Sequence, residues 1–192
     1  MSTPLSIRRA GPGDEDALAL VGQASFLETF AGILDGVAIV EHCRKAHAAA
    51  QYREWLADPD AAIWLAETAA GNAPVGYAVV ARAQLPGADA ERDLELKRIY
   101  LLSRFHGTGT GKRLMVQAVE FATAAGAERL LLGVYSGNEA AIAFYLRQGF
   151  VHFNQRQFNV GGRLYQDHVL SLALRPSAGG DVPAEAGTQE QV

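Results

Sequence analysis

Residues 107 to 112 of this 192-residue chain carry three glycines at alternate positions, Gly107, Gly109 and Gly111, followed by Lys112. A strand-like run precedes them, and a helical pattern begins at Gly109. Glycine lets the backbone approach a ligand closely, and the first N–H groups of a helix lack partners and carry partial positive charge. This segment therefore predicts a cradle for a pyrophosphate group.

Two common phosphate motifs do not fit this segment. A P-loop would need glycine where His106 stands and serine or threonine where Arg113 follows Lys112. The dinucleotide fingerprint, Gly-x-Gly-x-x-Gly, differs from the alternate spacing found here. The expected ligand is thus a phosphate compound of another kind.

The elements around the glycines predict an α/β (α+β) fold with a mixed, mostly antiparallel sheet flanked by helices. The expected strands are 5–9, 62–67, 75–83, 91–102, 129–135, 150–160 and 164–174, and the last two form a hairpin over Gly161 and Gly162. The expected helical regions are 15–30, 37–58, 109–125 and 138–148. One domain spans residues 5–175, and the tail 176–192 has too few large apolar side chains to order.

The strand before the glycines changes phase. Its apolar residues fall on even positions at Leu94 and Leu96, then on odd positions at Ile99 and Leu101. One extra residue in a β-bulge near Lys97 produces such a change. A bulge here would splay the strand from its neighbour and open a space beside it.

Two motifs resemble those of the GNAT superfamily, the Gcn5-related N-acetyltransferases. His106-Gly-Thr-Gly-Thr-Gly111 is similar to the family's Gln/Arg-x-x-Gly-x-Gly/Ala, with histidine at the first position. Asn138-Glu-Ala-Ala-Ile-Ala-Phe-Tyr-Leu-Arg-Gln-Gly-Phe150 fills every position of the family's second motif. The family uses the loop mainly through backbone N–H groups, so the histidine should alter a neighbouring contact without abolishing the site.

The resemblance implies the GNAT fold, with a splay between two parallel strands, and transfer of an acetyl group from acetyl-coenzyme A (acetyl-CoA) to a primary amine. Contacts with the donor are expected from strand residues and the glycine loop. These are Ile99, Tyr100, Leu101, His106, Gly107, Thr108, Gly109, Thr110, Gly111 and Lys112, together with Asn138 and Tyr145.

Acetyl transfer needs a base and an acid. An alkyl amine of pKa about 10.4 must lose a proton first, which costs about 4.6 kcal/mol at pH 7. Carboxylates on the strand before the loop, Glu91, Asp93 and Glu95, could accept this proton directly or through a water chain. Glu95 is favoured because it lies just upstream of the expected bulge. The resemblance assigns Tyr145 as the acid that protonates the departing thiolate.

The acceptor is predicted to be a small, polyamine-like molecule. Short stretches, 26–30 and 161–167, resemble the bacterial polyamine-acetylating branch of the family. Glu28, Asp35 and Glu41 lie in the region that borders the acceptor side in that fold and could hold its charged nitrogens. Two alternatives remain open: an N-terminal acetyltransferase of proteins or peptides, and a non-catalytic acyl-CoA-binding regulator.

Composition restricts the partners further. The net charge of −4 offers no general attraction to nucleic acid or anionic membrane, and no run approaches the roughly 20 apolar residues of a membrane span. The first residues lack the order of a secretory signal, so we expect a cytoplasmic protein, as a monomer or homodimer. No metal is expected in the site.

Overall fold

The computed structural model describes residues 4–174, so the tail predicted at 176–192 lies outside the described residues. Seven strands form one sheet in the order β1-β2-β3-β4-β5-β7-β6. The strands are β1 Leu5–Arg9, β2 Ala62–Thr68, β3 Pro74–Arg82, β4 Asp93–Leu101, β5 Arg129–Tyr135, β6 Val151–Val160 and β7 Arg163–Ala173. The helices are α1 Glu15–Phe30, α2 Gly36–Ala46, α3 Ala49–Ala57, α4 Thr110–Ala124 and α5 Glu139–Arg147, with a 3₁₀ turn at Ser103–Phe105.

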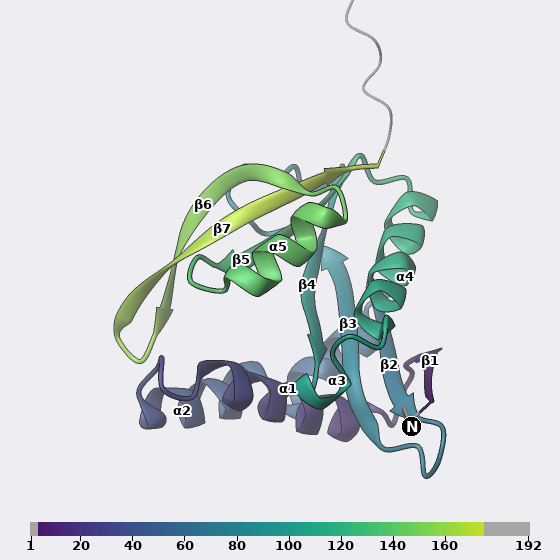
Figure 1. Cartoon of the computed structure of the whole chain (residues 1–192). Coiled ribbons are helices and arrows are strands. Elements are labelled where there is room, and N and C mark those ends of the chain that lie inside the picture. The colour runs from purple at the N-terminus through teal and green to yellow at the C-terminus, as the bar shows by residue number, and fades with distance from the viewer. Residues whose placement is uncertain (1–3, 175–192) are drawn as a thin grey trace, which may run out of the picture.

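Helices cover both faces of the sheet (Figure 1). Alternate residues of β2 point to opposite faces, as the pleat of a strand requires. Trp64 packs with α4 in one core, whereas Ile63 and Leu65 pack with α1 and α3 in another. The β4–β5 pair is parallel and every other pairing is antiparallel, as the sequence predicted.

The single helical region expected over 37–58 is wrong, because the helix breaks at residues 47 and 48. Ala48 has extended backbone angles (φ −72°, ψ 146°), and α3 begins after it. The break leaves the carbonyl of Ala46 free to accept a hydrogen bond from Arg98 of β4. It also turns the ring of His47 into the core, where the residue is 1% exposed.

The bulge predicted near Lys97 is confirmed. Val79 of β3 pairs with Arg98, and the next residue, Val80, pairs with Leu96, so Lys97 is the extra residue. On the other side of β4, pairing with β5 is confined to three positions and ends at Glu95 opposite Leu131. Beyond Glu95 the two parallel strands therefore diverge, while β5 continues along β7 to Tyr135.

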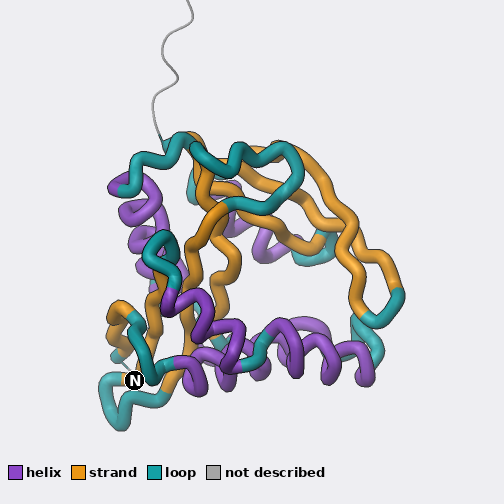
Figure 2. Tube along the Cα trace, turned by 180° about the vertical axis from the view of Figure 1, so that it is seen from behind, coloured by secondary structure: helices purple, strands orange, loops and turns teal. Residues whose placement is uncertain are grey.

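The hairpin β6–β7 reaches down to α2 (Figure 2). Val160, at the end of β6, packs in a small core with Phe26, Leu34, Ala38 and Ile39 of the α1–α2 region. The tip of the hairpin and the helical layer therefore close against each other. No helix within residues 4–174 is long and apolar enough to span a membrane.

Candidate active site

The glycine loop presents unpaired backbone donors at the start of α4. Among the described residues, the N–H groups of residues 107, 108, 109, 111 and 112 have no hydrogen-bond partner. Gly107 and Gly109 adopt φ of 75° and 79°, and a Cβ at either would meet nothing within 4 Å. Free donors beside open space at a helix N-terminus suit the pyrophosphate of a coenzyme A donor.

His106 and Asn138, two further residues expected to contact the donor, both bind backbone groups. The Nε2 atom of His106 donates to the carbonyl of Leu101 over 2.7 Å, so this histidine ties the loop to the end of β4. The Oδ1 atom of Asn138 accepts from the N–H of Ala141 and caps α5. Both side chains thus hold backbone segments in place, and Asn138 keeps its amide nitrogen available.

Tyr145 lies in the core of the α4–α5 face, 9% exposed, with its ring against Phe144 and Phe150. Its hydroxyl has no hydrogen-bond partner among the described residues. Among those residues, the fully buried side-chain atom without a partner is Ser25 Oγ, so the Tyr145 hydroxyl is not fully buried. The hydroxyl therefore retains access to solvent or ligand. Burial raises the pKa of Tyr145 well above its usual range, so the group stays protonated at neutral pH.

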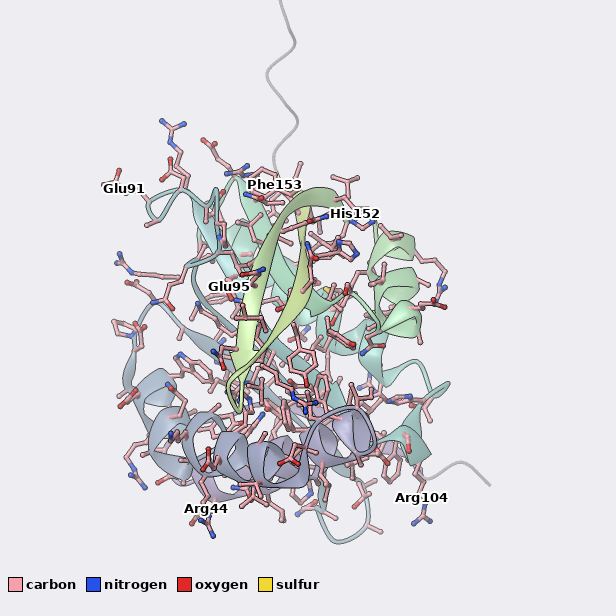
Figure 3. The ribbon with its side chains drawn as sticks, turned by 90° about the vertical axis from the view of Figure 1, so that its left-hand side faces the viewer. Arg44, Glu91, Glu95, Arg104, His152 and Phe153 are labelled. Atoms are coloured by element: carbon pink, nitrogen blue, oxygen red, sulfur yellow. The ribbon has the colours of Figure 1, made fainter. Side chains whose placement is uncertain are left out.

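The three carboxylates near β4 have different surroundings. Glu91 points away from the molecule on the loop before β4 (Figure 3). Asp93 is buried in a bidentate ion pair with Arg129, at 2.6 and 2.9 Å. Glu95 lies behind the β6–β7 hairpin in Figure 3 and lines a pocket of about 330 Å³. Of the three, Glu95 is the one placed to accept a proton in a pocket.

One oxygen of Glu95 is already engaged. Its Oε2 accepts from Lys97 Nζ at 2.7 Å and from the N–H of Gln84 at 2.9 Å, which leaves Oε1 for a water or an amine. Glu95 and Lys97 are two residues apart and share one face of β4, and the bulge at Lys97 brings the next residue, Arg98, to the same pocket.

The same pocket contains residues that the sequence did not single out. It lies between the α1–α3 layer and the diverging strands, and its polar lining includes Arg98, His42, His47, Arg156 and Asp167. Tyr100, expected to contact the donor, also lines this pocket, and its neighbours on β4, Ile99 and Leu101, pack on the α4 side. The pocket thus lies across β4 from the cradle.

A buried hydrogen-bond network forms the pocket's inner wall. Arg98 Nη1 donates to the Tyr52 hydroxyl at 2.6 Å and lies 3.2 Å from His47 Nδ1. The Tyr52 hydroxyl in turn lies 2.6 Å from that of Tyr77. The Arg98 guanidinium also stacks over Tyr52 and Trp55, 5.2 and 4.9 Å from the ring centroids.

The three acidic residues predicted for the acceptor do not come together. Glu28 accepts from the N–H and hydroxyl of Ser103, and these hydrogen bonds lower its pKa. Asp35 caps α2 through the N–H groups of residues 37 and 38. Asp35 and Glu41 line a separate groove of about 520 Å³ between α2 and the hairpin tip. Glu28 instead fixes the turn that precedes the glycine loop.

Comparison with known proteins identifies the family. The sequence profile of the acetyltransferase (GNAT) family matches residues 25–150. An uncharacterized N-acetyltransferase of Mycobacterium bovis is 36% identical over 125 residues, which cover 65% of this chain and 75% of that protein. One from Lactobacillus delbrueckii subsp. lactis is 37% identical over 81 residues, covering 42% of this chain and 47% of that protein.

Solved structures share the fold. The PaiA N-acetyltransferase of Thermoplasma acidophilum, in complex with coenzyme A, superposes with a TM-score of 0.72 at 20% identity, covering 88% of this chain and 99% of that one. The Salmonella typhimurium acetyltransferase YncA, solved with acetyl-CoA, gives 0.64 at 21% identity, covering 93% and 98%. The chain therefore belongs to the GNAT acetyltransferase family. It is an acyltransferase of the N-acetyltransferase class.

Proposed function

We propose that this enzyme transfers the acetyl group of acetyl-CoA to the primary amine of a small molecule, by direct attack in a ternary complex. The observation that carries the proposal is the set of unpaired N–H groups at residues 107–109, 111 and 112, together with the divergence of β4 and β5. A pyrophosphate fits the N–H groups, and the divergence gives the acyl arm a path toward Glu95 and Tyr145.

In the proposed reaction the amine nitrogen attacks the thioester carbon, an N–C bond forms, and the C–S bond breaks. Glu95 accepts the amine's proton, directly or through water, because it lines the pocket and its Oε1 has no hydrogen-bond partner among the described residues. Tyr145 donates its proton to the departing sulfur. The backbone of Ile99 and Leu101 forms hydrogen bonds with amides of the acyl arm. The carbonyl of Leu101 already accepts a hydrogen bond from His106, so Leu101 contributes its N–H group.

Closure of the hairpin over α2 supports a small acceptor rather than a protein terminus. The turn at Gly161 lies directly against Ala38, and Val160 packs with apolar residues of α1 and α2 beside it. A peptide entering from this side would have to separate these elements. A polyamine-like acceptor is a second candidate, favoured by Asp35 and Glu41 in the outer groove.

The function is tested by the release of free coenzyme A thiol from acetyl-CoA in the presence of amines. We expect small primary amines to stimulate release and to be recovered as N-acetyl products by mass spectrometry. Peptides with free N-termini should give less than about a tenth of that rate. Tight acetyl-CoA binding with no acetylated product from any amine or peptide would instead support the non-catalytic regulator.

Contact between the hairpin and α2 can be tested at adjacent glycines. A Cβ at Gly161 (φ 59°) would lie 2.4 Å from Ala38 Cβ, whereas a Cβ at Gly162 (φ 79°) would meet nothing within 4 Å. Gly161→Ala should lower the free energy of unfolding by about 1–3 kcal/mol more than Gly162→Ala, since both carry backbone strain and only the first overpacks the contact. Urea denaturation measures the difference. Equal losses would show that the contact does not hold the hairpin.

A further inference from the structure

Arg98 is a partly buried guanidinium with no carboxylate partner. Among the described residues it forms no ion pair; its contacts are with the Tyr52 hydroxyl, His47 Nδ1, the carbonyl of Ala46 and two aromatic rings. A guanidinium has five N–H groups, and these contacts use three of them. The Tyr77 hydroxyl also interacts with the guanidinium, so at least one N–H group of this desolvated cation is left without a partner among the described residues, and Arg98 lines the pocket.

The other charges of the pocket leave Arg98 uncompensated. Lys97 pairs with Glu95, and Arg156 pairs with Asp167 at 2.9 Å, so both carboxylates of the lining are already matched. Burial lowers the pKa of His42, and burial together with Arg98 lowers that of His47 to about 2, so both rings are uncharged at neutral pH. The lining therefore carries one positive charge in excess.

His47 adds a second donor to the same wall. Its Nδ1 faces Arg98 Nη1, which can only donate, and the Tyr52 hydroxyl at 2.9 Å. Nδ1 is therefore the unprotonated nitrogen, and the ring proton is on Nε2. Nε2 has no hydrogen-bond partner among the described residues, and it is not fully buried, so a ligand can reach it. Arg98 and His47 therefore offer this part of the wall N–H donors and one positive charge.

We propose that the acceptor carries a carboxylate in addition to its primary amine, and that Arg98, assisted by His47 Nε2, binds that carboxylate. This inference rests on the proposed function and specifies its substrate class, an amino acid or a related small amino carboxylate. A carboxylate would match the excess charge and occupy the free donors, because charge-assisted hydrogen bonds to guanidinium are among the strongest in proteins. A polycation would add positive charge to a lining that is already positive.

Spacing along β4 agrees with such a molecule. Glu95, which accepts the amine's proton, and Arg98 are three residues apart on one strand with a bulge between them, so their backbones are at most about 10 Å apart. An amine and a carboxylate separated by one to a few carbons span less than this. The hairpin tip packs against α2 on one side of the pocket, and the pocket volume of about 330 Å³ suits a small acceptor.

Two sets of matched amines test the proposal on the full chain. Leucine, leucinamide and 3-methylbutylamine share one side chain and differ only in the second group. 4-Aminobutanoate, butylamine and 1,4-diaminobutane do the same at a longer spacing. With thiol release as the readout, we expect the carboxylate member of at least one set to have a KM at least about tenfold lower than its neutral partner. Equal KM values within both sets, or a lower KM for 1,4-diaminobutane, would overturn the proposal.

Variants separate binding from a structural role. Arg98→Gln should raise KM for the carboxylate acceptor at least about tenfold, change KM for the neutral amine less than about twofold, and leave acetyl-CoA binding intact. Arg98→Lys should recover part of the loss, because it restores the charge but not the fork of donors. Arg44→Gln removes the same charge from an exposed side chain that points away from the pocket (Figure 3), and it should change neither KM. If Arg98→Gln raises both KM values equally, Arg98 is only structural.

A binding measurement on the wild-type protein tests the carboxylate site without a folded variant and without turnover. 4-Methylpentanoate, which has the carboxylate but no amine, should raise the Tm of the wild-type protein, whereas 4-methylpentanamide should not. If amines are acetylated but neither the KM sets nor Tm distinguish the carboxylate, the function stands and this inference fails. If no amine is acetylated and yet the carboxylate raises Tm, the site exists and the proposed function fails.

Discussion

Replacement of Gly109 by glutamate should abolish binding of acetyl-CoA, raising Kd by more than about 100-fold. The new carboxylate would project into the open space beside the free N–H groups, where a pyrophosphate is proposed to bind, and like charges placed together cost several kcal/mol. Isothermal titration calorimetry measures the change directly.

Gly71→Glu is the matched control. Gly71 has the same φ of 79° and the same absence of atoms within 4 Å, but it lies in the β2–β3 turn. Both variants carry the strain of a side chain at positive φ, about 1 kcal/mol, and the same added charge. The control should therefore bind acetyl-CoA like the wild-type protein. Full binding by the Gly109 variant would show that the donor's phosphates lie elsewhere.

Tyr145→Phe should reduce kcat by roughly 10- to 1,000-fold, the range of general-acid effects. The ring packs against Phe144 and Phe150, and the hydroxyl has no hydrogen-bond partner among residues 4–174, so the free energy of unfolding should change by less than about 0.5 kcal/mol. Steady-state kinetics with single-turnover measurements separates the chemical step from product release. Unchanged turnover with chemistry rate-limiting would refute the role of the hydroxyl.

Tyr100→Phe provides the comparison, because Tyr100 is the other tyrosine of β4 and α5 placed close to the reaction. Burial raises the pKa of both hydroxyls, so neither ionises near neutral pH. Loss of the acid by deprotonation should therefore not appear in the pH–rate profile below about pH 10. If Tyr100→Phe lowers kcat and Tyr145→Phe does not, the acid is Tyr100.

Much of the fold was predictable because local patterns and tertiary structure agree. The change of phase between Leu96 and Ile99 predicted a bulge, and the register of β3 against β4 places it at Lys97. The glycines predicted the start of α4, and the free N–H groups there follow from helix geometry. In both cases the signal lies within a few consecutive residues.

The pocket proposed to hold the acceptor was not predictable in the same way, because its walls come from distant segments. Nothing in the sequence near His47 shows that its ring meets Arg98, 51 residues further on, or that the helix breaks so that Ala46 can accept from the same guanidinium. The position of Glu28 in the sequence predicts a contact with the acceptor. In the structure its carboxylate meets Ser103, a contact across 75 residues.

The short pairing between β4 and β5 has a consequence for the protein in the absence of its donor. Strand pairing between β4 and β5 covers three residue pairs, and the Asp93–Arg129 ion pair lies at the same end, so the two parts of the sheet are paired at one end and separate at the other. Strand edges left open usually recruit other chains and promote aggregation, but these edges face each other inside the molecule. A slender ligand with amide groups can bridge them. A ligand that binds only the native state stabilises that state by mass action. The concentration of the donor should therefore also determine how often β4 and β5 move further apart.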